Sequence, residues 1–224
     1  MSSAPPLAAE AVSAILNRCQ TPVTPDEAVR LAGFLALLLR WNDRVNLTSL
    51  RNAEEMVQRH IADSVFCARD LPQGLKTLLD FGSGGGFPGI PIALLRTELS
   101  VTLAESQSRK SAFLREAVRS LGVHAEVWAH RVEQMPKERC FDCVTLRAVD
   151  RMPLACRTAA ARVAPGGTLI IFTTERLQEE VMQALPDWHW PKVSILPHAR
   201  QSLLLAGSRP KMFHVEQEAG SASR

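Results

Sequence analysis

The chain has 224 residues, of which 46% are hydrophobic and 22% are charged. This composition is ordinary for a globular protein and argues against a disordered or fibrous chain. With 26 Lys and Arg against 23 Asp and Glu, the net charge of +3 is too small to indicate nucleic-acid binding by bulk charge, so any basic surface must be a local patch.

The first third of the chain is predicted to be helical. Helices are expected over residues 6–19, 25–41 and 53–69, where apolar side chains recur at helical spacing. The second of these has a clear start, because Thr24 can act as the N-cap, Pro25 suits the first helical position and Glu27 completes a capping box. A polar loop that begins at Trp41 follows. We interpret residues 1–70 as an N-terminal helical appendage.

From residue 71 onward, short apolar runs alternate with helical stretches, which is typical of an α/β sheet. Strands are expected over residues 77–81, 101–104, 125–129, 143–146, 168–172, 193–196 and 202–206. Helices are expected over residues 89–96, 110–121, 153–163 and 175–184, the third of them stopped by Pro165-Gly166-Gly167. The last two strands are too close in sequence for a parallel crossover, so they should pair antiparallel.

The sequence therefore predicts a mostly parallel sheet with helices on both faces and one reversed strand near its end. We assign this α/β domain to residues 71–207. The remaining residues, 208–224, are polar and small, and we expect them to form a disordered tail.

The most specific pattern is the glycine-rich segment after the first predicted strand. Residues 80–89 read Asp-Phe-Gly-Ser-Gly-Gly-Gly-Phe-Pro-Gly. Glycines there permit positive φ angles and close approach of a ligand to the backbone, while the next helix offers free N–H groups. From Gly82 the spacing is Gly-x-Gly-x-Gly rather than the dinucleotide fingerprint, and it resembles the first motif of S-adenosylmethionine-dependent methyltransferases. A cationic sulfonium also tolerates Asp80 beside it. We predict donor contacts from Gly82, Ser83 and Gly84.

Three more strand ends carry candidate residues. Glu105 ends the second strand, nineteen residues after Gly86, where a carboxylate can accept both ribose hydroxyls. Val132 and Glu133 follow the third strand, where an adenine edge would lie, although Glu133 can equally begin a surface helix. Arg147 ends the fourth strand and faces the crevice outside the carboxyl ends of the strands. It can pair with a ligand carboxylate, with the acidic residue of the first strand or with RNA phosphate.

Together these segments resemble the RsmG family, also called GidB, bacterial methyltransferases that modify N7 of a guanine in 16S ribosomal RNA. The resemblance covers about residues 25–206. It rests on residues 41–42, 46–49, 59–64, 80–91, 103–106, 109–110, 113–114, 131–133 and 146–148. The stretch 87–91, Phe-Pro-Gly-Ile-Pro, is unusual among methyltransferases in general, which makes the resemblance specific. By this resemblance the donor is contacted by Gly82, Phe87, Val132, Glu133 and Arg147, and its ribose by Glu105.

The resemblance implies a Rossmann-like class I methyltransferase that uses S-adenosylmethionine, with 16S ribosomal RNA or the small ribosomal subunit as its partner. Neutral guanine N7 carries an in-plane lone pair and needs no deprotonation, so we expect alignment rather than a catalytic base, and no metal. For the RNA we predict contacts from Asn46, His60, Arg109 and Lys110. His60 can equally be a core histidine that bonds Asp63, and the basic helix can simply be solvated.

One departure from the family pattern concerns the fifth strand. That strand usually ends in Lys-Gly, but here Phe172 is followed by Thr173 and Thr174, so a basic residue near the cleft is missing. Arg176 is the candidate to compensate. The departure keeps open a methyltransferase for another substrate. A nicotinamide-dependent oxidoreductase and a non-catalytic RNA-binding module are the remaining alternatives.

The cysteines and the absence of long apolar runs bear on the compartment. Five scattered cysteines do not form a disulfide pattern, and Cys140 and Cys143 lack the second pair that a zinc site needs. No 18-residue uncharged apolar stretch and no basic-then-apolar N-terminus occur, so we expect neither a membrane span nor a signal peptide. The sequence predicts a cytoplasmic monomer.

Overall fold

The computed structural model describes residues 7–149, 151–197 and 201–209. Its helices are α1 (Ala9–Arg18), α2 (Pro25–Val45), α3 (Ala53–Met56), a π-helical turn (Val57–Ile61), α4 (Ala62–Asp70), α5 (Gly89–Leu95), α6 (Ser108–Leu121), a 3-10 turn (Val132–Gln134), α7 (Met152–Ala160) and α8 (Glu175–Ala184). Its strands are β1 (Thr77–Phe81), β2 (Ser100–Ala104), β3 (Ala125–Trp128), β4 (Phe141–Arg147), β5 (Val163–Thr174), β6 (His189–Ile195) and β7 (Ser202–Ser208). The predicted start of the first helix at residue 6 and most of the predicted tail, residues 210–224, lie outside the described residues.

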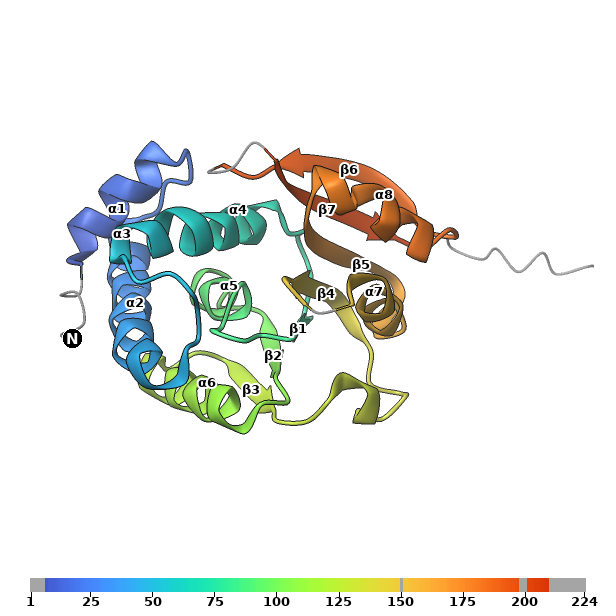
Figure 1. Ribbon diagram of the computed structural model, residues 1–224, viewed down its shortest axis with the longest axis horizontal. Helices are drawn as coiled ribbons and strands as arrows, with labels where there is room; N and C mark the ends of the chain where they lie inside the picture. Colours follow the sequence, from blue (N-terminus) through green and yellow to red (C-terminus); the bar gives the residue numbers. More distant parts are fainter. Residues whose placement is uncertain (1–6, 150, 198–200, 210–224) are drawn as a thin grey trace, which may run out of the picture.

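The strands form one sheet in the order β3-β2-β1-β4-β5-β7-β6 (Figure 1). Strands β1 to β5 pair in parallel, whereas β7 is antiparallel to both β5 and β6. The predicted mostly parallel sheet with a reversed last strand is therefore confirmed. The strand order changes direction between β1 and β4, and in such sheets ligands bind at this point, beyond the carboxyl ends of the strands.

Both faces of the sheet are buried under helices. Neighbouring residues of β1 point to opposite faces, so Leu78 belongs to a buried cluster that includes side chains of α1, α2, α4, α5 and α6, while Leu79 belongs to a second cluster with side chains of α7 and α8. Figure 1 shows the two groups on opposite sides of the central strands. The helices before residue 71 thus share one cluster of buried side chains with the sheet.

The start of α2 forms as the sequence predicts. Thr24 Oγ1 accepts a hydrogen bond from the Glu27 backbone nitrogen at 3.3 Å, and Glu27 Oε2 accepts one from the Thr24 nitrogen at 2.8 Å. The helix continues to Val45, beyond the predicted end, and Asn46 closes it in a left-handed conformation. None of the helices in the described ranges combines the length and the apolarity needed to cross a bilayer.

The expected helix over residues 53–69 is confirmed in extent by α3, the π-helical turn Val57–Ile61 and α4, although the turn itself was not predicted. One local prediction was wrong. The segment Pro165-Gly166-Gly167 was expected to stop a helix, but α7 already ends at Ala160 and the segment belongs to β5. A Cβ on Gly167 would lie 2.7 Å from the Asp142 carbonyl oxygen, so the glycine is needed for the close approach of β5 to β4.

Candidate active site

The glycine-rich loop between β1 and α5 has the backbone that its sequence requires. Gly82, Gly84 and Gly86 have φ angles of +72°, +53° and +86°, in the left-handed region where L side chains are strained. A Cβ on Gly82 would also lie 2.9 Å from Val149 Cγ1. The loop is fixed to the neighbouring strand because the Ser83 nitrogen donates to the Ala104 carbonyl at 2.9 Å. These contacts form a rigid cradle at the end of the sheet.

Asp80 holds this loop from inside the protein. Its side chain is buried, and Oδ2 accepts a hydrogen bond from the Gly89 nitrogen at 3.1 Å while Oδ1 accepts one from Thr145 Oγ1 at 2.9 Å. Burial raises the pKa of Asp80 to about 6. Asp80 lines none of the three cavities described below. In the structure Asp80 fastens the loop to the start of α5, and its position beside the donor stays a prediction.

Glu105 connects the end of β2 to the loop. Its side chain is largely buried, and each carboxylate oxygen accepts one backbone hydrogen bond, Oε2 from Gly84 at 3.0 Å and Oε1 from Gln107 at 2.7 Å. A carboxylate offers about four lone-pair sites, so both oxygens keep the capacity to accept further hydrogen bonds. Their orientation is set before any ligand binds.

Three adjoining cavities follow the carboxyl edge of the sheet. The β2 cavity, of about 480 Å³, lies against the ends of β2 and β3, and the loop cavity, of about 420 Å³, lies over the glycines. The β5 cavity, of about 330 Å³, lies at the ends of β4 and β5. The first two share Gly82, Glu105 and Val149, whereas the last two share His60, Arg147 and Ala148.

The structure brings all eight predicted donor contacts to the first two cavities. The β2 cavity is lined by Gly82, Glu105, Val132 and Glu133, and the loop cavity by Gly82, Ser83, Gly84, Phe87, Glu105 and Arg147. Val132 and Glu133 begin a 3-10 turn after β3. Their roles in binding stay predictions.

Of the four residues predicted to contact RNA, two line a cavity and two do not. His60 and Lys110 line the loop cavity, whereas Asn46 and Arg109 are exposed residues that line none of the three cavities. The Asn46 side chain accepts a hydrogen bond from Arg51 at 2.8 Å. Arg176 is also exposed and outside the three cavities, so it does not supply the missing basic group there.

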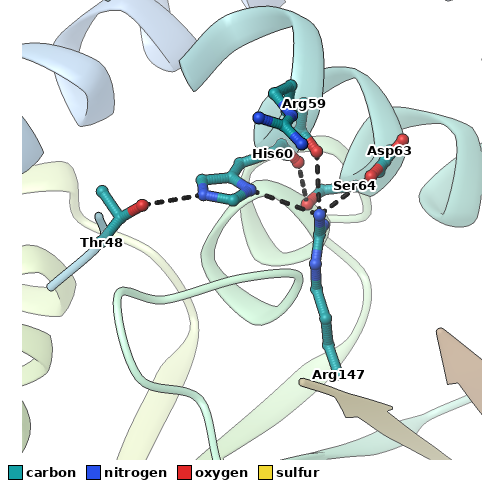
Figure 2. Close-up of polar contacts among 6 residues, drawn as sticks. All are labelled: Thr48, Arg59, His60, Asp63, Ser64 and Arg147. Carbon is teal, nitrogen blue, oxygen red and sulfur yellow. Dashed lines mark hydrogen bonds and ion pairs between the residues drawn. The ribbon is translucent and has the colours of Figure 1, made fainter. Parts of the chain in front are cut away.

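Arg147 is held by a polar network that the sequence did not reveal (Figure 2). Its Nη2 atom donates to Asp63 Oδ2 at 2.9 Å and to the Arg59 carbonyl at 2.8 Å, and lies 3.3 Å from His60 Nδ1. On its other side, His60 Nε2 lies 2.9 Å from Thr48 Oγ1. The Arg147 guanidinium carbon also lies 5.1 Å from the centre of the Phe172 ring.

Burial and charge act in opposite directions on Arg147. Burial lowers the pKa of the guanidinium, while the Asp63 carboxylate favours its charged form. The Arg59 carbonyl and His60 both belong to the π-helical turn, a type of distortion that is frequent at functional sites. Sequence reasoning offered three partners for Arg147, and the structure adds a fourth, Asp63.

Within the described ranges, no group of three or more His, Cys, Asp or Glu residues is placed to hold a metal ion. Cys140 is exposed and Cys143 is buried in β4, and both are free thiols. Burial raises the pKa of the Cys143 thiol to about 12.

Comparison with known proteins identifies the family. A family model described as GidB, rRNA small subunit methyltransferase G, matches residues 28–199. The chain belongs to the GidB family. A relative from Halorhodospira halophila, named ribosomal RNA small subunit methyltransferase G, is 44% identical over 161 residues, covering 70% of this chain and 74% of the relative. A relative of the same name from Xanthomonas euvesicatoria is 38% identical over 180 residues, covering 79% and 84%.

Solved structures of other methyltransferases share the fold of this GidB protein. The ribosomal protein L11 methylase from Lactobacillus delbrueckii subsp. bulgaricus aligns with a TM-score of 0.58 at 14% identity, over 68% of this chain and 79% of the other. The glycopeptide N-methyltransferase MtfA, solved with S-adenosylmethionine, aligns with a TM-score of 0.56 at 10% identity, over 67% and 94%. The sheet is therefore that of a class I methyltransferase.

Proposed function

We propose that this GidB protein transfers a methyl group from S-adenosylmethionine to N7 of a guanine in the 16S RNA of the small ribosomal subunit. Family membership supports the methyl transfer and the small-subunit RNA, since the family and the relatives carry that description. The guanine and its N7 follow from the motif resemblance. The observation that carries the proposal is that Glu105 and the glycine loop meet at the wall shared by the β2 and loop cavities.

The residues present fit the methyl donor. In the proposed mode, Val132 and Glu133 adjoin the adenine in the β2 cavity, and the two oxygens of Glu105 accept the ribose hydroxyls. Gly82 and Gly84 then contact the methionine end, because without side chains they let a ligand approach the backbone of the loop closely. The donor supplies an electrophilic methyl group on a sulfonium.

The chain's own contribution to catalysis is positioning. Guanine N7 is nucleophilic without losing a proton, so the reaction requires N7, methyl carbon and sulfur in line and water excluded. Holding two reactants in such a geometry can lower a barrier by roughly 7–11 kcal/mol. The positive charge moves from sulfur to the base, and Asp63 keeps the Arg147 charge beside that site balanced.

The test is methyl transfer by the full chain. The protein is incubated with methyl-labelled S-adenosylmethionine and either small-subunit RNA transcribed in vitro or small-subunit particles, and the RNA is digested to nucleosides. The expected result is label in 7-methylguanosine. Label in neither substrate overturns the proposal, and label on a protein or small molecule favours another methyltransferase activity. RNA binding without affinity for S-adenosylmethionine indicates a binding module, and affinity for a nicotinamide dinucleotide instead indicates an oxidoreductase.

The proposal includes the organisation of the chain and its surroundings. Residues 1–70 are the helical appendage, whose described helices share a buried cluster with one sheet face, and residues 71–207 are the donor-binding domain. The tail expected from residue 208 starts later, because Ser208 is the last residue of β7, and residues 210–224 lie outside the described part of the chain. The protein works as a monomer in the cytoplasm, and the free cysteines support the reducing compartment. Sedimentation of the full chain tests the monomer, and a dimer that persists on dilution contradicts it.

A further inference from the structure

Helices α2 and α6 lie side by side on the same side of the central strands (Figure 1). A Cβ on Gly33, in the first half of α2, would meet Leu121 at the end of α6. Near the other end of α2, the ring of Trp41 lies 5.8 Å from the ring of Phe113, near the start of α6. These two contacts show that the helices run in opposite directions. The end of α2 therefore lies beside the start of α6.

The two helix ends border the loop cavity and carry positive charge. The cavity is lined there by residues 47–48, which follow α2, and by Lys110 in the first turn of α6. Arg51 belongs to the same place, because its guanidinium donates to the Asn42 carbonyl at 3.3 Å and to Asn46 Oδ1 at 2.8 Å, at the end of α2. We define the basic rim as the four cations at these ends, Arg44, Arg51, Arg109 and Lys110.

The charge of the basic rim is not balanced by ion pairs. In the described part of the chain none of its four side chains forms an ion pair with a carboxylate, whereas seven other Arg and Lys side chains do. The last turn of α2 contributes one carboxylate, that of Asp43, and the first turn of α6 contributes none. The nearby Glu105 carboxylate accepts from two backbone N–H groups instead. Uncompensated positive charge remains beside the cavity.

Two residues of the basic rim occupy positions that are unfavourable for stability. The N-terminus of a helix carries a partial positive charge, so acidic residues are favoured in its first turn and cations are not. Nevertheless α6 begins with Ser108, Arg109 and Lys110, and it has neither an acidic residue in its first turn nor a side-chain cap. Proteins break such local rules mainly at functional sites. The placement favours a role in binding an anionic partner.

We infer that the phosphate backbone of the substrate RNA lies on the basic rim. The inference rests on the proposed function and names the RNA-contacting surface within it. An enzyme that acts on a base takes that base into a pocket, and the phosphates of the strand stay outside. Cations that border the pocket then hold the phosphates, and they set the position of the strand without reading its sequence.

The basic rim combines the two parts of the chain. Arg44 and Arg51 come from the helical appendage, whereas Arg109 and Lys110 come from the donor-binding domain. Asn46, which the sequence also predicts as an RNA contact, is hydrogen-bonded to Arg51 within the rim. The helical appendage thus supplies half of the proposed RNA surface in addition to its buried contacts with the sheet.

The test removes two rim charges that lie outside the three cavities, in the double variant Arg44→Gln with Arg109→Gln. The dissociation constant of the full chain for small-subunit RNA transcribed in vitro, measured by filter binding, should rise about tenfold or more at about 0.1 M salt. The slope of its logarithm against the logarithm of the salt concentration should fall by about 1–2, because each lost phosphate contact removes about 0.7–0.9. The dissociation constant for S-adenosylmethionine, measured by calorimetry, should stay within about twofold of wild type.

Two further double variants separate charge from shape and from location. Arg44→Lys with Arg109→Lys keeps both charges and should bind RNA within about threefold of wild type, since the phosphate term depends on charge. The matched control is Arg157→Gln with Arg176→Gln. It makes the same change in net charge at exposed residues of α7 and α8, which cover the opposite face of the sheet, and it should also bind within about threefold.

Stability gives a readout that separates binding from a structural role. Arg109→Gln alone removes a cation from the first turn of α6, so it should melt at the same or a higher temperature than wild type. Its affinity for RNA should nevertheless fall several-fold. A purely structural role of Arg109 would instead lower the melting temperature together with the affinity.

The outcomes for this inference and for the proposed function are distinguishable. Wild-type RNA affinity and salt dependence in Arg44→Gln with Arg109→Gln overturns the inference while the proposed function stands. An equal loss in the α7–α8 control, or in the variant that keeps both charges, also overturns it. Binding of wild type to vesicles of anionic lipid but not to RNA overturns it and assigns the basic rim to a membrane surface. If RNA bound through the rim receives no methyl group, the proposed function fails and the inference stands.

Discussion

Asp63 and Arg147 are 84 positions apart in the sequence, yet their side chains form an ion pair of 2.9 Å between Oδ2 and Nη2. The Asp63 side chain is 1% exposed and that of Arg147 is 16% exposed. The pair joins helix α4 to the end of β4 and therefore ties the N-terminal helices to the carboxyl edge of the sheet. The orientation of Arg147 depends on a part of the chain that lies outside the sheet.

The Asp63→Asn variant tests how strongly this pair holds the fold. Removing one partner of a buried ion pair leaves the other charge uncompensated, so we expect the free energy of unfolding to fall by about 3 kcal/mol. Asp70 on the same helix pairs with Lys192, whose side chain is half exposed, and Asp70→Asn should cost less than about 1 kcal/mol. Urea unfolding measures both. Equal losses in the two variants would contradict the special role of Asp63.

Because the Asp80 carboxyl is buried, we predict that the free energy of unfolding depends on pH. Burial raises its pKa to about 6 from 3.8, so the folded state binds the carboxyl proton more tightly than the unfolded state. Its stabilising effect is therefore full at low pH and is lost as the pH rises through about 6. A difference of about two in pKa corresponds to about 3 kcal/mol. We expect the free energy of unfolding of wild type, relative to Asp80→Asn, to fall by about 2 kcal/mol between pH 4 and pH 7.5, since the rest of the effect lies below pH 4.

Asp80→Asn is suited to this comparison because it can keep both hydrogen bonds. Its amide oxygen can accept from Gly89, while its amide nitrogen donates to Thr145, whose hydroxyl then turns to the Leu79 carbonyl at 3.5 Å. The control is Asp142→Asn. Burial acts to raise the pKa of Asp142, but the backbone N–H groups of Lys76 and Thr77 lower it, so its contribution should be constant between pH 5 and pH 7.5. If the difference in the free energy of unfolding between wild type and Asp80→Asn does not change with pH, the prediction is refuted.

Replacing two helical glycines with alanine should change the free energy of unfolding in opposite directions. A Cβ on Gly89 would lie 2.4 Å from Leu103 Cδ2 and 2.6 Å from Asp80 Oδ2, so Gly89→Ala should lower the free energy of unfolding by about 2 kcal/mol or more. Gly33 is an exposed position within α2, where a Cβ meets Leu121 Cδ2 at an ordinary 3.6 Å. Gly33→Ala should therefore stabilise the protein by roughly 0.5–1 kcal/mol. Thermal and urea unfolding of both variants check the signs, and a neutral Gly89→Ala would show that Leu103 can move aside.

The features that the sequence predicted correctly are those with a local physical cause. The capping box at Thr24 and Glu27 needs residues three positions apart, and the positive φ angles of Gly82 and Gly84 follow from the glycines themselves. The reversed strand β7 follows from a connection too short for a crossover. Each inference uses only neighbours along the chain.

The features that were missed depend on tertiary contacts. The amino-acid sequence of residues 53–69 does not distinguish a π-helical turn from a regular helix. The turn is seen only in the structure, where it places the Arg59 carbonyl beside Arg147. The burial of Asp80 was missed because a carboxylate at a strand end is usually solvated. The three cavities are formed by chain segments from residue 47 to residue 202, so no single motif reveals them.

Glu105 provides the most direct test of the donor site. Glu105→Gln replaces one acceptor oxygen with an amino group that would face a backbone N–H, of Gly84 or of Gln107, and it removes the charge that strengthens hydrogen bonds to hydroxyls. We expect the dissociation constant for S-adenosylmethionine to rise about 10- to 100-fold, since hydrogen bonds to charged groups contribute about 1.5–3 kcal/mol. Glu126→Gln, on the neighbouring strand and outside the three cavities, should bind within twofold of wild type. Calorimetric titration distinguishes the two, and wild-type affinity in Glu105→Gln would exclude this carboxylate from the donor site.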